Sequence, residues 1–293
     1  MFEALNAPTA IDDPAEYFAY GSQFRKGDPY RVISRSDLYA FGKCPHRWLM
    51  SGTKESSPEM NWGSLVDCLW LTPQVMLTKY AYAPATYPSK DGEKPWNWAA
   101  TVCKEWREKV EAEGRICIKQ DMYLAASDAA NALDKHPIAS EISKESRKQV
   151  LAKAIWKDEE TGVEVPIKAL IDLLPYSGSK FGDTIFDLKT TAHADYRSWV
   201  RHVFQYGLHY QAAMYIDIIN ASGKGYAHFG HIIQESSAPY ETCVRLLGHE
   251  FIALGRMLYR NDLKRYCQCL KTGVFPGLDN TIVEPEAWMM TAE

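Results

Sequence analysis

Two aspartates and a lysine near the middle of the 293-residue chain have side chains and spacing suited to cation-assisted hydrolysis. Asp172 is followed after 14 residues by Asp187, and Lys189 lies two positions further on. Both acids lie among apolar residues, where a carboxylate is costly to bury unless it is paired or binds a metal. Two carboxylates and one ammonium can hold a divalent cation and still leave a positive charge for the chemistry. The alternative is a buried ion-pair network.

The segments that must position these residues are two predicted strands joined by a Gly/Ser-containing turn, within residues 163–191. The first carries apolar residues at a period of two, which predicts one buried face: Val163, Val165, Ile167, Ala169, Ile171 and Leu173. Asp172 falls on the opposite face of that strand. In the second strand Ile185, Asp187 and Lys189 share one side. The alternation therefore predicts Asp187 and Lys189 together, with Asp172 available from the neighbouring strand.

The surrounding segments predict a mixture of strands and helices. Residues 149–156 and the 163–174 strand form a hairpin signal across a polar turn. Residues 199–219 predict one helix, 226–234 a further strand and 240–271 a long amphipathic helix. The first 30 residues show no sustained period, and we expect a loosely packed arm there.

The pattern D-x(14)-D-L-K resembles the D…(D/E)xK signature of the PD-(D/E)xK nuclease superfamily. In the predicted 199–219 helix, Gln211 and Tyr215 lie four apart on one face. They match the QxxxY element of the superfamily's exonuclease branch. Together, DLKTT and QYGLHYQAAMY resemble RecE-like (exonuclease VIII-type) phage recombination nucleases and their RecB-family relatives.

This resemblance implies the architecture. The fold class is α/β (α+β), with a central mixed β-sheet flanked by helices and a restriction-endonuclease-like core that carries an N-terminal helical elaboration. We expect residues 1–30 to be the arm and 31–293 a single nuclease domain, with the metal-site core at about 149–235.

The resemblance also implies a metal site for Mg²⁺ or Mn²⁺. The expected ligands are Asp172, Asp187 and the Leu188 backbone carbonyl. The related families place a histidine four residues after a helical glycine, whereas here Gly63 is followed at that spacing by Asp67. A carboxylate is a good ligand for these hard cations, so Asp67 is a further candidate; a core hydrogen bond is its alternative.

The predicted mechanism is hydrolysis of DNA phosphodiester bonds. Lys189 would orient the attacking water and stabilise the developing oxyanion. Gln211 and Tyr215 would position Lys189, the water or the substrate phosphate. Candidate contacts to the DNA backbone, which would be salt-dependent and independent of base sequence, are Lys168, Arg197 and Arg201.

Composition and charge indicate the general class of the protein. Hydrophobic residues make up 46% and charged residues 24%, as in ordinary globular proteins. No apolar run reaches about 18 residues, so no membrane span is expected. The N-terminus lacks the basic start and apolar region of a signal peptide. The net charge of −4 does not favour nucleic-acid binding, although acids at a catalytic site lower the total without excluding a local basic groove.

The cysteines predict reduced thiols in a cytoplasm, since seven of them are unevenly spaced. Some RecB-family nucleases hold an iron–sulfur cluster through three closely spaced C-terminal cysteines after a distant first one. Here only Cys267 and Cys269 are close together, and Cys243 lies far upstream. No iron–sulfur cluster is therefore expected.

The resemblance suggests a finer role as a 5′-to-3′ exonuclease that acts on linear duplex DNA. It also implies that the protein is of phage or prophage origin and acts in the cytoplasm of a bacterial host. It implies a single-strand annealing protein as a partner and a ring-forming homo-oligomer. One alternative is a structure-specific or single-strand nuclease of the same superfamily that acts in repair. The other is a catalytically inactive DNA-binding module.

Overall fold

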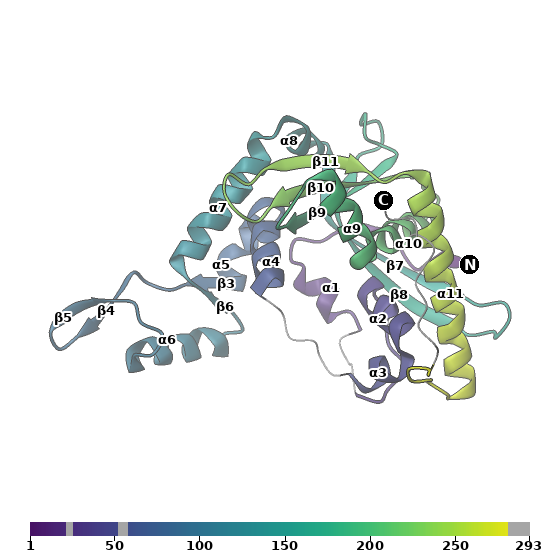
Figure 1. Ribbon diagram of the computed structural model, residues 1–293, viewed down its shortest axis with the longest axis horizontal. Coiled ribbons are helices and arrows are strands. Elements are labelled where there is room, and N and C mark those ends of the chain that lie inside the picture. The colour runs from purple at the N-terminus through teal and green to yellow at the C-terminus, as the bar shows by residue number, and fades with distance from the viewer. Residues whose placement is uncertain (22–25, 52–57, 281–293) are drawn as a thin grey trace.

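The computed structural model describes residues 1–21, 26–51 and 58–280, and a mixed β-sheet lies at its centre (Figure 1). Among the described residues the sheet has seven strands in the order β1-β7-β8-β9-β10-β11, with β2 also pairing with β7. They are β1 (Phe2–Ala4), β2 (Thr9–Ala10), β7 (Ser146–Lys157), β8 (Glu164–Pro175), β9 (Thr184–Thr191), β10 (His228–Glu235) and β11 (Thr242–Leu246). Strands β9 and β10 run parallel, and the other neighbours are antiparallel. The predicted fold class is confirmed.

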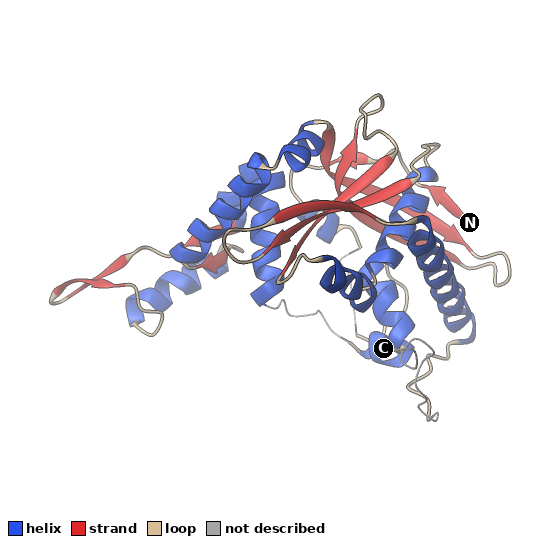
Figure 2. Cartoon of the chain, turned by 45° about the horizontal axis from the view of Figure 1, so that its top comes forward, coloured by secondary structure: helices blue, strands red, loops and turns tan. Residues whose placement is uncertain are grey.

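Helices cover both faces of this sheet (Figure 2). They are α1 (Ala15–Ala19), α2 (Arg35–Lys43), α3 (Pro45–Met50), α4 (Pro58–Leu71), η1 (Pro73–Val75), α5 (Met76–Lys79), α6 (Thr101–Ala112), α7 (Gln120–Lys135), α8 (Pro137–Lys144), α9 (Tyr196–Gln205), α10 (Leu208–Asn220) and α11 (His249–Thr272). One core packs α2, α10 and α11 against the sheet, and a second packs α4, α7 and α8. No helix in the described ranges has the length and apolar character needed to cross a membrane.

A smaller unit projects from the body beside α4 and α7 (Figure 1). It contains the parallel pair β3 (Tyr80–Tyr82) and β6 (Ile116–Ile118), the hairpin of β4 (Thr86–Ser89) and β5 (Gly92–Pro95), and helix α6. This unit carries none of the predicted site residues.

The predicted hairpin is the β7–β8 pair, which runs in register from Ser146 opposite Pro175 to Lys157 opposite Glu164. The predicted apolar face is correct as far as Ile171, which packs in the core with α10, but Leu173 packs in the opposite core with α4. The change of face occurs between Ile171 and Leu173, which pair with Val150 and Lys148 of β7. Between these two partners lies Gln149, whose φ of 47° interrupts the regular strand conformation of β7.

The N-terminal segment is not a loosely packed arm. Strand β1 extends the sheet by pairing with β7, with Phe2 opposite Trp156. The Phe2 ring centroid lies 5.2 Å from that of Trp156 and 6.0 Å from that of Tyr259. Short strands of three and two residues give too little periodicity to be detected in the sequence.

Two predicted helices have different bounds in the structure. The predicted 199–219 helix is two helices, α9 and α10, which are separated at Tyr206 and Gly207. Gly207 has a φ of 61°, and a Cβ at this position would lie 2.5 Å from the Tyr39 ring, so the break requires glycine. The predicted 240–271 helix begins at His249, because residues 242–246 pair with β10 as strand β11.

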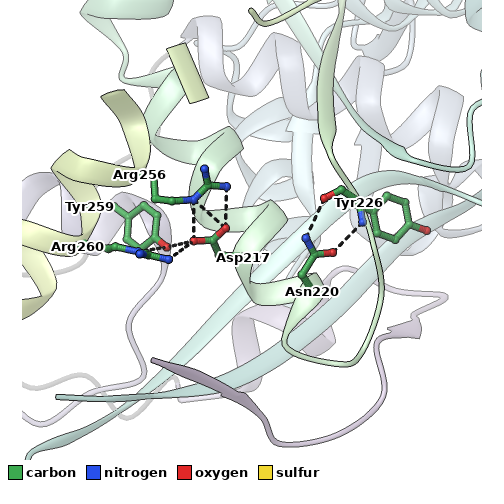
Figure 3. Close-up of polar contacts among 6 residues, drawn as sticks. All are labelled: Asp217, Asn220, Tyr226, Arg256, Tyr259 and Arg260. Atoms are coloured by element: carbon green, nitrogen blue, oxygen red, sulfur yellow. Dashed lines mark hydrogen bonds and ion pairs between the residues drawn. The ribbon is translucent and has the colours of Figure 1, made fainter. Parts of the chain in front are cut away.

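A polar network joins α10 to α11 (Figure 3). The Asp217 carboxylate on α10 accepts hydrogen bonds from Arg256 at 2.8 Å, from Arg260 at 2.9 Å and from the Tyr259 hydroxyl. The Asp217 side chain is only 13% exposed, so these donors satisfy a largely buried charge. The network sets the position of the helix that carries Gln211 and Tyr215.

We expect Asp217→Ala to lower the free energy of unfolding by about 2 kcal/mol, because it removes the acceptor shared by two arginines and a buried tyrosine. Urea denaturation measures the loss. The control is Asp91→Ala, which breaks an exposed pair with Lys94 and should leave the midpoint unchanged. Equal losses in the two variants would contradict the importance assigned to the α10–α11 network.

Candidate active site

Asp172 and Leu188 meet where β8 and β9 separate. Within the described residues these strands pair only at Leu173 and Phe186. One residue before that pair, the Asp172 Oδ2 atom accepts a hydrogen bond from the Leu188 backbone N–H at 2.9 Å. The N–H and C=O of an extended residue point to the same edge of a strand, so the Leu188 carbonyl is directed to the same gap. The carboxylate therefore occupies a place that a neighbouring strand would otherwise fill.

Asp187 is the meeting point of three of the predicted residues. Its Oδ2 atom forms an ion pair with the Lys189 Nζ atom, and its Oδ1 atom accepts a hydrogen bond from Gln211 Nε2 at 2.8 Å. Tyr215 lies one turn further along α10 and is also buried. Asp187 is 3% exposed, whereas the Lys189 side chain is 26% exposed. Lys189 is thus the more accessible of the two charged residues.

The charges in this gap perturb one another. Burial, followed by the charges of Asp187 and Asp67, raises the pKa of Asp172 well above its usual value. Burial lowers the pKa of Lys189, but the charges of Asp187 and Asp172 outweigh burial and the pKa is raised. Lys189 therefore remains protonated at neutral pH. His231 is opposite Asp187 in the β9–β10 register and fully buried, and burial lowers its pKa to about 3.

Asp67 reaches the same region from α4. It lines a cavity of about 110 Å³ together with Asp172, Gln149 and Lys79. Burial, opposed by the Lys189 charge, raises the pKa of Asp67 to about 7. Helix α4 therefore brings Asp67 to Asp172.

The donor set suits a hard divalent cation, because it consists of carboxylates and a backbone carbonyl. As the side chains stand, no three His, Cys, Asp or Glu residues in the described part of the chain are grouped closely enough to hold an ion. The Lys189 ammonium lies against Asp187, where it offsets part of the negative charge. A cation bound between Asp172 and Asp187 would therefore require that Lys189 move away from the Oδ2 atom.

Arg35, which the sequence analysis did not identify, also lies near the site. It is the first residue of α2 and donates hydrogen bonds to the backbone carbonyls of Tyr206 and Gly207, the latter at 2.7 Å. It thereby holds the break between α9 and α10 that lets Gln211 face Asp187. Two features of the sequence could have pointed to this contact: a serine before the start of α2, suited to cap that helix, and a glycine within the apparent 199–219 helix.

The three candidate DNA contacts differ in position. Lys168 is 8% exposed, and its ammonium donates to the backbone carbonyls of Tyr17 at 2.9 Å and Tyr20 at 2.6 Å. It anchors α1 and is not available for a DNA contact. Arg197 and Arg201 are exposed on α9.

A hollow of about 670 Å³ opens beside Lys189, and we call it the outer hollow. Its lining includes Trp62, Thr190, His193, Ser198, Arg201 and Tyr206. Thr190 directly follows Lys189 in β9, and the pKa of His202, which also lines the hollow, is lowered by burial and by the Lys189 charge. The hollow therefore lies near Lys189. It offers one arginine and several hydroxyl and aromatic groups to a ligand.

Comparison with known proteins identifies the fold. Residues 33–281 match the sequence family described as "PDDEXK-like domain of unknown function (DUF3799)". A protein from Eubacterium rectale, provisionally named an exonuclease, has a TM-score of 0.54 at 14% identity, over 89% of this chain and 93% of its own. Rai1 from Scheffersomyces stipitis has a TM-score of 0.31 at 13% identity, over 71% of this chain and 59% of its own. No curated protein matches the sequence.

The raised pKa of Asp67 predicts a pH effect on stability in EDTA. A half-buried acid with a pKa of about 7 binds its proton more tightly in the folded state than in the unfolded state, where the value is about 3.9. Its stabilising contribution is therefore present at low pH and is lost as the pH rises from about 4 to about 7. We expect Asp67→Asn to gain stability relative to the parent protein at pH 8 compared with pH 5. Thermal unfolding at both pH values measures this, and an identical pH dependence would contradict it.

Proposed function

Since the chain belongs to the family of PDDEXK-like domains, we propose that it is a metal-dependent nuclease that hydrolyses DNA phosphodiester bonds. The observation that carries this proposal is the convergence at Asp187: Lys189 and Gln211 both bind its carboxylate. Asp172 is held in the adjoining gap by the Leu188 N–H. Two acids and a protonated lysine at one strand edge suit the cleavage of an anionic phosphodiester.

Asp172, Asp187, the Leu188 carbonyl and Asp67 would hold Mg²⁺ or Mn²⁺. Such an ion, when bound, lowers the pKa of a coordinated water and neutralises charge on the reacting phosphate. The surplus of carboxylates over ammonium groups around the small cavity supports this assignment. Burial is the main cause of the raised pKa of Asp172 and of Asp67, and the charge of Asp187 adds to it in both cases.

Lys189 acts as a cationic hydrogen-bond donor. Its raised pKa disfavours a role as a general base at neutral pH. The ammonium, carried on a partly exposed side chain, instead orients the attacking water and donates to the oxygen on which negative charge develops.

Gln211 and Tyr215 support this arrangement from α10. The Gln211 amide fixes Asp187 by donating to Oδ1, so that Oδ2, which pairs with Lys189, is the oxygen that a cation would take when Lys189 moves away. Burial keeps the pKa of Tyr215 well above its usual value, so its hydroxyl remains a potential donor at neutral pH. Tyr215 would position the substrate phosphate or the water.

The finer proposal is a 5′-to-3′ exonuclease that acts on linear duplex DNA during phage-type recombination, with a single-strand annealing partner, and that assembles as a ring. It is supported by the DLKTT and QxxxY resemblance, and by the provisional exonuclease name of the Eubacterium rectale protein. A nuclease for single-stranded or branched DNA is the second candidate. The outer hollow favours it, because hydroxyl and aromatic groups with one arginine suit an unpaired strand.

We expect Lys189→Ala to reduce Mg²⁺-dependent digestion of linear duplex DNA by at least about 100-fold, since it removes a transition-state donor. The measurement is release of label from a duplex marked separately at each 5′ and 3′ end. Digestion by Lys189→Ala at the parent rate would contradict the assigned site. Binding of duplex DNA by the parent protein without any Mg²⁺-dependent digestion would favour an inactive DNA-binding module.

The same assay separates the two candidate functions. Release from 5′ ends, with closed circles left intact, supports the recombination exonuclease. Preferential cleavage of single-stranded substrates or of closed circles supports the second candidate.

Arg201→Ala should weaken DNA binding and reduce the slope of log affinity against log salt by about 1, because one phosphate contact is lost. Fluorescence anisotropy with Ca²⁺ in place of Mg²⁺ measures both effects. Lys168→Met is the matched control, since it also removes one positive charge but from a buried lysine. If Lys168→Met changes the salt slope as much as Arg201→Ala, the assignment of the outer hollow is wrong.

A further inference from the structure

Gln149 has a backbone conformation that is unusual for its place in the fold. It lies inside the central strand β7, between Lys148 opposite Leu173 and Val150 opposite Ile171. Its φ is 47°, in the left-handed region, and its side chain is 4% exposed. A residue with a Cβ adopts this region only at a cost in free energy, and such cost is often retained at functional sites.

The contacts of Gln149 point to Asp172. The backbone carbonyl of Gln149 accepts a hydrogen bond from the Ile11 N–H at 3.0 Å, which ties the N-terminal segment to β7. Its side-chain Nε2 atom donates to Asp172 Oδ1 at 3.2 Å. Gln149 and Asp172 line the same 110 Å³ cavity as Asp67.

Both oxygens of Asp172 are therefore held by a neutral donor. Oδ1 accepts from the Gln149 amide, and Oδ2 accepts from the Leu188 N–H. Each carboxylate oxygen can accept more than one hydrogen bond or ligand, so these two donors fix the rotation of the group and leave lone pairs for the cavity. A neutral amide does this without adding a further charge beside Asp67 and Asp187.

We propose that Gln149 is a positioning residue for the cation site, which holds Asp172 in the orientation that binds the metal. The inference rests on the proposed function, in which Asp172 is a metal ligand. Gln149 acts through Asp172 and need not touch the cation or the DNA. Hydrogen-bond partners of metal ligands commonly contribute about 10- to 100-fold to metal affinity.

The test measures Mn²⁺ binding and stability separately, on the full chain and without DNA. Gln149→Leu keeps a buried side chain of similar size but removes the amide. Gln149→Gly also removes the amide, and it relieves the backbone because glycine adopts a φ of 47° readily. Electron paramagnetic resonance of free Mn²⁺ gives the dissociation constant, and urea denaturation in EDTA gives the midpoint.

We expect both variants to bind Mn²⁺ about 10- to 100-fold more weakly. Gln149→Gly should have the higher urea midpoint of the two and yet bind Mn²⁺ no better than Gln149→Leu. A structural role alone would instead make Mn²⁺ affinity follow stability. The matched control is Gln234→Leu, because Gln234 is fully buried and its amide donates to the backbone carbonyl of Ala129. It should lower the midpoint and leave Mn²⁺ affinity unchanged.

Asp172→Asn distinguishes failure of this inference from failure of the proposed function. If Asp172→Asn abolishes Mn²⁺ binding while both Gln149 variants bind with the parent affinity, the positioning role is overturned and the cation site stands. If Asp172→Asn itself binds Mn²⁺ with the parent affinity, the cation site is overturned as well.

Discussion

The hydrogen bond from the Leu188 N–H to the Asp172 carboxylate is the contact around which the candidate site is built. It forms next to the point where β8 and β9 pair, and it uses a side chain where a sheet would normally use a backbone carbonyl. The gap that results leaves the edge of β9 at Leu188 without a backbone partner from β8. An acid, a backbone carbonyl and the Asp187–Lys189 pair are thereby brought to one place by the geometry of a single strand.

The helices and the N-terminal segment hold this gap in position. Helix α10 delivers Gln211 to Asp187, and its direction depends on the Gly207 break that Arg35 binds. Its far side is tied to α11 by the Asp217 network (Figure 3). Strands β1 and β2 pair with β7, and the segment that follows β2 hydrogen-bonds to the carbonyl of Gln149. Residues distant in sequence therefore support the same few side chains.

The sequence was sufficient to predict the elements with a strong local period. The β7–β8 hairpin and strand β10 were predicted because apolar alternation and turn residues mark them, and the mixed sheet was implied by the family resemblance. The sequence was not sufficient where tertiary contacts determine the secondary structure or the burial of a side chain. Gly207 breaks a helix whose apolar pattern continues across it, and residues 242–246 form a strand because β10 offers them an edge. Lys168 looked like a surface cation, but α1 covers it and supplies its partners.

The residues of the candidate site that belong to a motif were predictable from the sequence, but Gln149, the neutral group that orients Asp172, was not. Asp172, Asp187, Lys189 and Gln211 carry a recognisable spacing, whereas Gln149 belongs to no motif and matters through its backbone conformation and its partner. The difference has a physical origin. Charge must be placed at particular positions to act on a substrate, but a buried carboxylate can be oriented by any donor that reaches it. The charged residues can therefore be predicted from spacing, whereas a supporting donor that lies outside any motif, such as Gln149, is found only in the three-dimensional structure.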